Sequence, residues 1–276
     1  MSIEKGHPHV LYITTHHHFP PDDSQIWLSA SMILIYRQCP KRVENMFYEG
    51  LPYHPNELMV LGTLMHTIFD KFYDDIDMAY LLTMKVREEV QIYFRNILPN
   101  NNDKINEWLD TFSVIESMRW EIISKYDFPE QYFPPYRKEL YLELKTLGLF
   151  GTIDRIDRSI NGFVLLDYKG KPGSYMSDIR RQLWIYQTLV NYQKPQLVPG
   201  KIKEVGAYFY KTGDIYTDVL GYQTINAAIK AIHKTRNCIK KGLFPRNIQE
   251  HCFSCSYLYL CLEEEEFDEQ FQERFG

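Results

Sequence analysis

Two stretches in the middle of the chain, Gly151-Thr-Ile-Asp154-Arg-Ile-Asp157 and Val164-Leu-Leu-Asp167-Tyr-Lys169, decide the fold that the sequence predicts. Both are rich in the residues that favour β-strands, and Asn161-Gly162 between them is a strong hairpin signal. Just upstream, Glu139–Lys145 alternates like a third strand. We therefore expect three consecutive antiparallel strands, and the apolar run 163–168 is suited to the centre of a sheet.

Helical patterns surround these strands. The order of helices, strands, a helix and further strands predicts an α+β fold with a mixed central sheet flanked by helices. We expect an irregular arm at 1–28 and a single domain over 29–262, with a helical part at 29–130, a core at 131–220 and a C-terminal helix with clustered cysteines at 221–262. Expected helices are 29–50, 57–75, two within 80–125 broken near 99–102, 177–191 and 224–242, and a later hairpin is expected at 204–210 and 215–219.

Composition is ordinary for a soluble globular protein, with 45% hydrophobic and 24% charged residues. No apolar run approaches the ~20 residues that span a bilayer, and the N-terminus lacks the apolar core of a secretory signal. We expect a cytoplasmic protein. The net charge of −5 does not itself indicate nucleic acid, but six of the 36 acidic residues lie within 263–269. The segment 263–276 is therefore expected to be an acidic tail, and the remaining, nearly neutral body could carry a basic groove.

Asp154, Asp167 and Lys169 form a candidate catalytic group. Asp154 and Asp167 can lie side by side on adjacent antiparallel strands, and Lys169, two residues after Asp167, points to the same face. Two carboxylates with a nearby carbonyl oxygen suit Mg²⁺ or Mn²⁺, which can polarise a phosphodiester and lower the pKa of a bound water. The ammonium can orient that water or stabilise charge on phosphate.

The Asp-x-Lys triplet alone is a weak signal, because one should occur by chance about once in a chain of this length. Glu143-Leu-Lys145 is a rival with the same face geometry, although no Gly-x-x-Asp precedes it. An ion pair at a strand end is the alternative interpretation of Asp167 and Lys169.

Taken with two further motifs, these stretches resemble the RecB-like PD-(D/E)xK nuclease family, especially its CRISPR-associated iron–sulfur exonuclease branch. The further motifs are Gly62-x-x-x-His66 and Gln182-x-x-x-Tyr186, whose i, i+4 spacing puts the second pair on one helical face. The resemblance implies a restriction-endonuclease-like core. It also implies that Mg²⁺ or Mn²⁺ is bound by His66, Asp154, Asp167 and the Tyr168 carbonyl, and that the catalytic residues are Asp154, Asp167, Lys169, Gln182 and Tyr186.

Five cysteines raise a second metal question. Cys252-x2-Cys255-x5-Cys261 and Cys39 could supply four thiolates, which suit either a [4Fe–4S] cluster or structural Zn²⁺. The resemblance favours the iron–sulfur cluster, which would hold the two ends of the chain together. Cys238 is expected to be a small buried hydrophobe, and the alternative is that it replaces Cys39 as a ligand.

The resemblance implies a DNA exonuclease that prefers single-stranded ends and acts in CRISPR adaptation or in DNA recombination and repair. The implied partners are DNA, and either CRISPR adaptation proteins or a separate helicase. A helicase would be another chain, because this one has no Walker-type Gly-x-x-x-x-Gly-Lys. Two other classes are a catalytically inactive nuclease-fold adaptor and a zinc-stabilised nucleic-acid-binding module. Candidate phosphate contacts near the triplet are Lys171, Arg180 and Arg181.

Overall fold

The computed structural model describes residues 26–172, 176–202, 204–219 and 221–275, so the expected arm at 1–28 lies almost wholly outside the described residues. The chain divides into two compact units. One, Gly62–Ile229, contains the central sheet and is called the sheet unit here; the other combines Met1–Leu61 with Lys230–Gly276 and is called the terminal unit. Within the described ranges, no helix is both long and apolar enough to cross a membrane.

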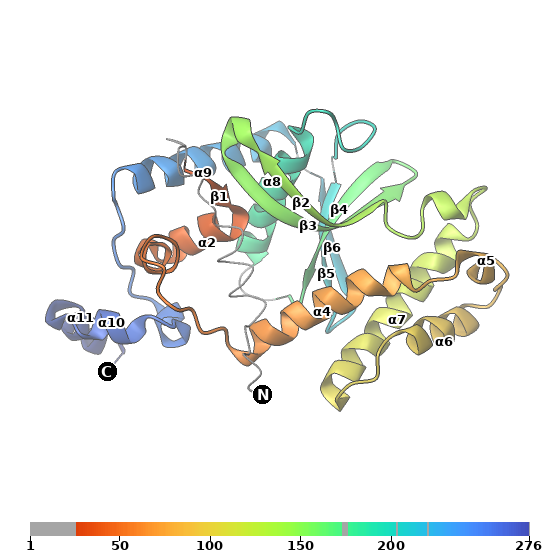
Figure 1. Cartoon of the computed structure of the whole chain (residues 1–276), viewed down its shortest axis with the longest axis horizontal. Coiled ribbons are helices and arrows are strands. Elements are labelled where there is room, and N and C mark those ends of the chain that lie inside the picture. The colour runs from red at the N-terminus through yellow and green to blue at the C-terminus, as the bar shows by residue number, and fades with distance from the viewer. Residues whose placement is uncertain (1–25, 173–175, 203, 220, 276) are drawn as a thin grey trace, which may run out of the picture. The chain divides into compact units, whose positions relative to one another are not determined.

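The sheet of the sheet unit is mixed, as the sequence predicts (Figure 1). Its first three strands pair antiparallel in chain order, the fourth runs parallel to the third, and the fifth returns antiparallel. The apolar strand 162–169 therefore lies inside the sheet, where a continuous hydrophobic sequence is expected. The strands are β2 (Arg137–Leu144), β3 (Leu149–Ser159), β4 (Gly162–Lys169), β5 (Glu204–Phe209) and β6 (Asp214–Val219), in that spatial order.

The turns of the meander follow from their glycines. Gly148 has φ 51° and ends the short 3-10 turn between β2 and β3, and Gly162 has φ 127° after the β3–β4 turn. Residues with a Cβ adopt such backbone angles only at a cost, so glycine fixes both reversals. The expected strand Glu139–Lys145 is confirmed with bounds earlier by one or two residues.

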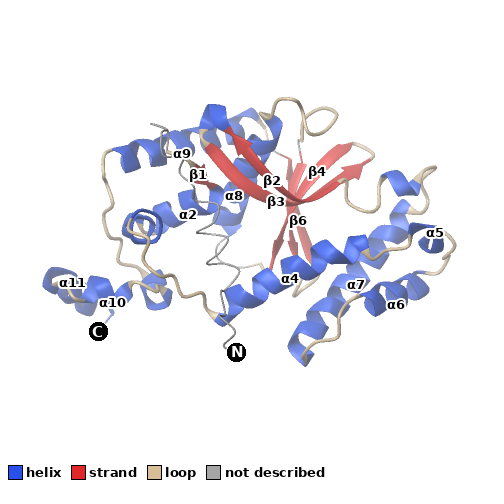
Figure 2. Cartoon of the chain, viewed as in Figure 1, coloured by secondary structure: helices blue, strands red, loops and turns tan. Residues whose placement is uncertain are grey.

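Helices flank this sheet (Figure 2). The expected break near 99–102 is confirmed, because the Asn102 side chain accepts the Ile105 N–H at 3.1 Å and caps the longest helix. The segment 80–125 holds parts of three helices, not two. The helices are α4 (Glu57–Asp74), α5 (Met78–Leu81), α6 (Arg87–Ile97), α7 (Asp103–Ile123) and α8 (Met176–Asn191), and α4 continues from the terminal unit into this one.

Within the sheet unit, α4 and α7 cover the sheet face that carries Tyr168 and Tyr208. Phe69 of α4 stacks on Phe112 of α7 with ring centroids 4.1 Å apart. Phe69 also lies 4.9 Å from the Tyr168 ring, and Phe112 lies 5.8 Å from the Tyr208 ring. Aromatic contacts of this kind each add about 0.5–1.5 kcal/mol beyond burial. Because side chains alternate along a strand, Asp167 and Lys169 point away from these helices.

Helix α8 packs against β2, β3, β4 and β5. A Cβ at Gly151 would lie 3.3 Å from the Tyr186 ring of α8. The glycine that opens the Gly-x-x-Asp motif therefore allows α8 to approach β3 closely, beside the carboxylate that follows three residues later.

The terminal unit begins with β1 (Leu28–Ser29) and α2 (Ala30–Gln38), which Ser29 caps by accepting the Met32 N–H at 3.1 Å. The single helix expected over 29–50 is wrong. The backbone is extended at Cys39, with φ −153° and ψ 104°, because the following proline disfavours helical geometry. The chain resumes as α3 (Pro40–Val43) and a π-helical turn (Glu44–Tyr48).

The C-terminal part of this unit follows α9 (Tyr222–Lys240), which starts in the sheet unit. A 3-10 turn (Glu250–Ser254) and α10 (Leu258–Leu262) carry the clustered cysteines. Most of the acidic segment forms α11 (Glu265–Phe275). Phe267 and Phe271, spaced i, i+4, are buried with Cys252, while the glutamates face outward.

Candidate metal and catalytic site

The central carboxylates lie where β3 and β4 stop pairing. The antiparallel ladder ends at Arg155–Leu166, and the next residues toward its open end are Asp154 and Asp167. Asp154 Oδ2 accepts the backbone N–H of Tyr168 at 2.7 Å. A side chain therefore accepts a hydrogen bond at the point where the two strands separate, which is called the fork here. Asp154 and Asp167 are only 7% and 2% exposed, which places two acids in a site where charge is costly.

His66 reaches this fork from α4. Its Nδ1 lies 3.5 Å from Asp154 Oδ2. Burial opposes protonation of the imidazole, but the Asp154 carboxylate outweighs it and raises the pKa of His66. Burial likewise opposes ionisation of Asp154, but His66 and Lys169 outweigh it and lower the pKa of that carboxyl. The Gly62-x-x-x-His66 element thus delivers its histidine to the first predicted acid.

Asp167 and Lys169 form an ion pair on one face of β4. Burial raises the pKa of Asp167 to about 6 despite the Lys169 ammonium, and the charge of Asp154 adds to the rise. Two close carboxylates cannot both ionise freely without a cation between them. The two carboxylates therefore need more positive charge nearby than Lys169 alone supplies.

Glu139 is a site residue that the sequence analysis missed. It lies opposite Asp154 in the β2–β3 register, between the pairs Lys138–Arg155 and Leu140–Ile153. One ligand oxygen of Glu139, one of Asp154 and one nitrogen of His66 lie within 4.8 Å of one another. Burial, with the charge of Asp154, raises the pKa of Glu139 to about 7.

The backbone of Glu139 is itself unusual, with φ 42°. A non-glycine residue in this region is strained, and such strain concentrates at functional sites. Glu139 Oε1 is buried and has no hydrogen-bond partner among the described residues. An orphaned buried acceptor beside a carboxylate and an imidazole fits a divalent cation.

Helix α8 adds Gln182 and Tyr186. Gln182 Nε2 donates to Tyr186 Oη at 3.0 Å, which confirms that the two share a helical face. Burial raises the pKa of Tyr186 well above its usual value, and the carboxylates of Asp167 and Asp154 raise it further. The phenol therefore stays protonated next to the acidic cluster and can donate a hydrogen bond.

A model of the PD-(D/E)XK nuclease superfamily matches residues 27–262. The chain belongs to this superfamily. The mixed sheet flanked by helices fits the fold of the superfamily, whose members are usually nucleases that use divalent metals. Membership therefore indicates a metal-dependent nuclease with DNA as substrate. No curated protein matches the chain significantly.

The rival triplet and the candidate phosphate contacts lie outside the carboxylate cluster. Glu143 and Lys145 of the rival triplet are exposed. Arg180 pairs with Asp218 at 3.0 Å, and Arg181 lies 3.4 Å from Asp178, so both guanidinium groups already face acids. Lys171 is exposed just beyond the end of β4.

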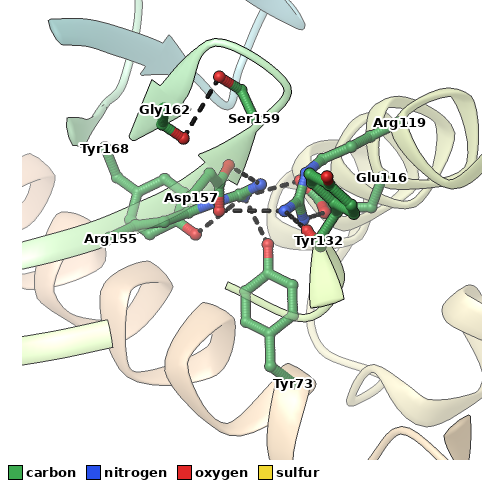
Figure 3. A network of polar contacts seen from close by, with 9 residues as sticks. All are labelled: Tyr73, Glu116, Arg119, Tyr132, Arg155, Asp157, Ser159, Gly162 and Tyr168. Atoms are coloured by element: carbon green, nitrogen blue, oxygen red, sulfur yellow. Dashed lines mark hydrogen bonds and ion pairs between the residues drawn. The ribbon is translucent and has the colours of Figure 1, made fainter. Parts of the chain in front are cut away.

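A buried network of charged residues lies next to the candidate site (Figure 3). Arg155, next to Asp154, is 1% exposed. Its Nη1 donates to Glu116 Oε1 at 2.8 Å, and its Nε donates to both oxygens of Asp157 at 2.9 Å. Arg119 bridges the same two acids at 3.1 and 3.0 Å, so two cations and two anions balance.

This network also reaches the residue between Asp167 and Lys169. Arg155 Nη1 lies 3.4 Å from the Tyr168 hydroxyl and donates to the Tyr73 hydroxyl of α4. The Tyr168 side chain is thereby held on the helix-covered face while its backbone N–H binds Asp154. No sequence pattern predicts this network, because Glu116 comes from α7, far from Arg155 and Asp157 along the chain.

All five cysteines lie in the described part of the chain and are free thiols. Asn247 donates to the Gln38 carbonyl at 2.7 Å, and Lys41 N–H donates to the Pro245 carbonyl at 3.3 Å. These bonds within the terminal unit bring Cys39 toward the C-terminal cysteines. Burial raises the pKa of Cys252 and of Cys261, and in each case Cys39 and Cys255 raise it further, which places these thiols near one another. Cys238 instead contacts Tyr36.

Proposed function

We propose that the chain is a DNA exonuclease that prefers single-stranded ends and acts in CRISPR adaptation or in recombination and repair. The convergence of His66, Glu139 and Asp154 beside the Asp167–Lys169 pair, within a superfamily of nucleases, carries the hydrolytic part of the proposal. The preference for ends, the pathway and partners such as adaptation proteins or a separate helicase rest on the resemblance to the CRISPR-associated exonuclease branch.

The residues at the fork fit one or two Mg²⁺ or Mn²⁺ ions. Carboxylate and carbonyl oxygens suit either ion, and the imidazole of His66 favours Mn²⁺. A divalent ion held there supplies Lewis acidity toward the phosphodiester and lowers the pKa of bound water. The ligands we assign are His66, Glu139, Asp154, Asp167 and the carbonyl of Tyr168.

Each remaining residue has a role that its position supports. Lys169 forms an ion pair with Asp167, so its ammonium can orient the attacking water and stabilise charge on the phosphate oxygens. Tyr186 keeps its proton, and with Gln182 it offers donors that can position the scissile strand. Asp154, fixed by the Tyr168 N–H and His66, keeps its oxygens aimed at the fork.

The test is cleavage of labelled linear single-stranded DNA in Mn²⁺ by wild type, Asp167→Asn and Lys145→Ala. Loss of cleavage in Asp167→Asn with retention in Lys145→Ala is expected, because only the former lies in the buried cluster. Cleavage that survives Asp167→Asn removes this site from the reaction. A circular single strand that is cut as fast as the linear one overturns the exonuclease assignment.

We infer that the cysteines hold a [4Fe–4S] cluster. Cys252-x2-Cys255-x5-Cys261 with Cys39 supplies four thiolates, and the resemblance to the iron–sulfur exonuclease branch supports the cluster over Zn²⁺. Broad visible absorption of anaerobically purified protein supports the cluster, and a colourless protein containing stoichiometric zinc overturns it.

A further inference from the structure

A group of lysines gathers next to the catalytic strand, and the proposed chemistry does not use it. β4 and β5 continue to pair beyond their ends, where Tyr210 N–H donates to the Lys169 carbonyl and Lys211 N–H donates to the Gly170 carbonyl, both at 3.0 Å. Lys211 therefore lies just past the end of β5, the strand that pairs with β4 and its Lys169. Its side chain lies over Gly170, since a Cβ there would be 3.2 Å from Lys211 Cε and 3.6 Å from its Nζ.

The Trp108 ring of α7 collects two of these ammonium groups. Lys211 Nζ lies 4.1 Å from the ring centroid, and Lys104 Nζ, from the first turn of α7, lies 5.8 Å from it. Trp108 is only 5% exposed, so the ring is a floor beneath the lysines and is not free to stack on a base. Cation–π attraction holds the ammoniums in place without neutralising them.

Among the described residues, neither Lys104 nor Lys211 forms a salt bridge. Burial lowers the pKa of Lys211, and the charges of Lys104 and Lys171 lower it further. Lys138, by contrast, pairs with Asp70 at 2.7 Å. Mutual repulsion at one spot is relieved when an anion binds there.

We infer that Lys104, Lys171 and Lys211 form a phosphate-binding subsite over the Trp108 ring, which holds the nucleic-acid backbone at the end of β4 where the candidate catalytic residues lie. The inference deepens the proposed function and rests on it for the identity of the substrate. Lys211 lies over Gly170, which directly follows Lys169, so the three ammoniums lie at the end of β4 that carries Asp167 and Lys169, where a bound nucleic-acid backbone would leave the site. Contacts of this kind position the strand and do not read its sequence.

The test measures binding of a fluorescent single-stranded DNA across a salt series, with Ca²⁺ in place of Mn²⁺ and electrophoresis showing that the probe stays intact. Lys211→Met keeps the apolar stem over Trp108 and removes the charge. Lys125→Met is the matched control, since Lys125 lies just past the other end of α7 and pairs with Glu121.

We expect Lys211→Met to weaken binding several-fold at moderate salt and to lower the slope of log K against log[salt] by about 0.7 for each lost phosphate contact. Lys104→Met lowers the affinity and the slope similarly. Lys211→Arg keeps most of the wild-type affinity, and Lys125→Met matches wild type. Thermal melting checks that each variant is folded. Affinity and slope unchanged in Lys211→Met and Lys104→Met, in folded proteins, overturn the subsite.

The outcomes separate this inference from the proposed nuclease. Cleavage that depends on Asp167, with binding that ignores Lys211 and Lys104, leaves the nuclease standing and removes the subsite. Binding that depends on these lysines, without Asp167-dependent cleavage, supports the subsite in a protein that is not a nuclease. A wild type that binds no DNA overturns both.

Discussion

Glu139 stands opposite Asp154 across β2 and β3, and its φ of 42° breaks the regular strand at that one residue. A carboxylate oxygen from each residue and a His66 nitrogen lie within 4.8 Å of one another. The distortion is therefore located at the residue that we propose as the third metal ligand, and it leaves Glu139 Oε1 buried without a partner in the described structure. We interpret the strained backbone as part of how the site is assembled.

Replacing Glu139 with Gln should weaken Mn²⁺ binding by at least ten- to a hundredfold, the range seen for residues that only support ligands. The amide removes a charge and keeps the shape. Titration calorimetry of wild type and Glu139→Gln measures the effect. Glu143→Gln on the same strand is the control, because Glu143 is exposed. Equal affinities in wild type and Glu139→Gln would falsify the assignment.

Replacing Glu139 with Gly should have opposite effects on stability and on function. Glycine adopts φ 42° without strain, and burial of an unpartnered oxygen is removed as well. We expect the metal-free variant to be more stable than wild type by about 1 kcal/mol in urea unfolding, while Mn²⁺ binding is lost. A variant that is less stable than wild type would show that the Glu139 side chain serves the fold.

The two raised carboxyl pKa values predict how metal-free stability depends on pH. Glu139 titrates at about 7 and Asp167 at about 6 in the folded chain, above their usual values near 4. Between the usual pKa and the raised pKa of each carboxyl, the folded chain binds more protons than the unfolded chain. The free energy of unfolding therefore falls as pH rises. Urea unfolding in chelator should show a decline from about pH 5 to 7.5.

Addition of Mn²⁺ should reverse this decline, because metal binding stabilises the ionised carboxylates. The Glu139→Gln variant, which has no proton to lose at that position, should show a shallower decline in chelator than wild type does. A wild-type stability that is flat over this pH range contradicts the buried-acid description of the site.

Removing Arg155 should unfold the sheet unit more readily than removing any surface charge. Arg155→Met leaves Glu116 and Asp157, both buried, with only Arg119 to balance them. Breaking a buried ion pair costs about 3–5 kcal/mol, whereas an exposed pair contributes about 0–1 kcal/mol. Chemical denaturation of Arg155→Met and Lys125→Met measures the contrast, and similar losses in both would refute the structural weight given to this network.

The strands and the catalytic pattern were predictable because they depend on local signals. The hairpin turn at Asn161-Gly162 and the apolar run into Asp167 are visible in the sequence, and register then brings Asp154 and Asp167 to one fork. The i, i+4 spacing of Gln182 and Tyr186 likewise needs only a helix. Local patterns of this kind carried the fold class and the candidate acids, although their catalytic roles stay predictions.

The remaining features depend on tertiary structure. Glu139 has the sequence appearance of an ordinary strand residue, and its positive φ arises only when β2 is placed against β3. Arg155 meets Glu116 from a helix that no local pattern connects to it. Pro40 is a local signal for the helix break at Cys39, but the capping and apolar signals of 29–50 favour one continuous helix.

The proposed iron–sulfur cluster has Cys39 as its fourth ligand. Cys39 lies near Cys252, Cys255 and Cys261 in the terminal unit, whereas Cys238 contacts Tyr36. Cys39→Ser should therefore lose most of the visible absorption and the bound iron, and it should melt at a lower temperature because the cluster no longer joins distant segments. Cys238→Ser should keep both the iron and the melting temperature. Iron retained in Cys39→Ser and lost in Cys238→Ser would move the fourth ligand to Cys238, and zinc found in wild type would change the metal while leaving the comparison of the two variants valid.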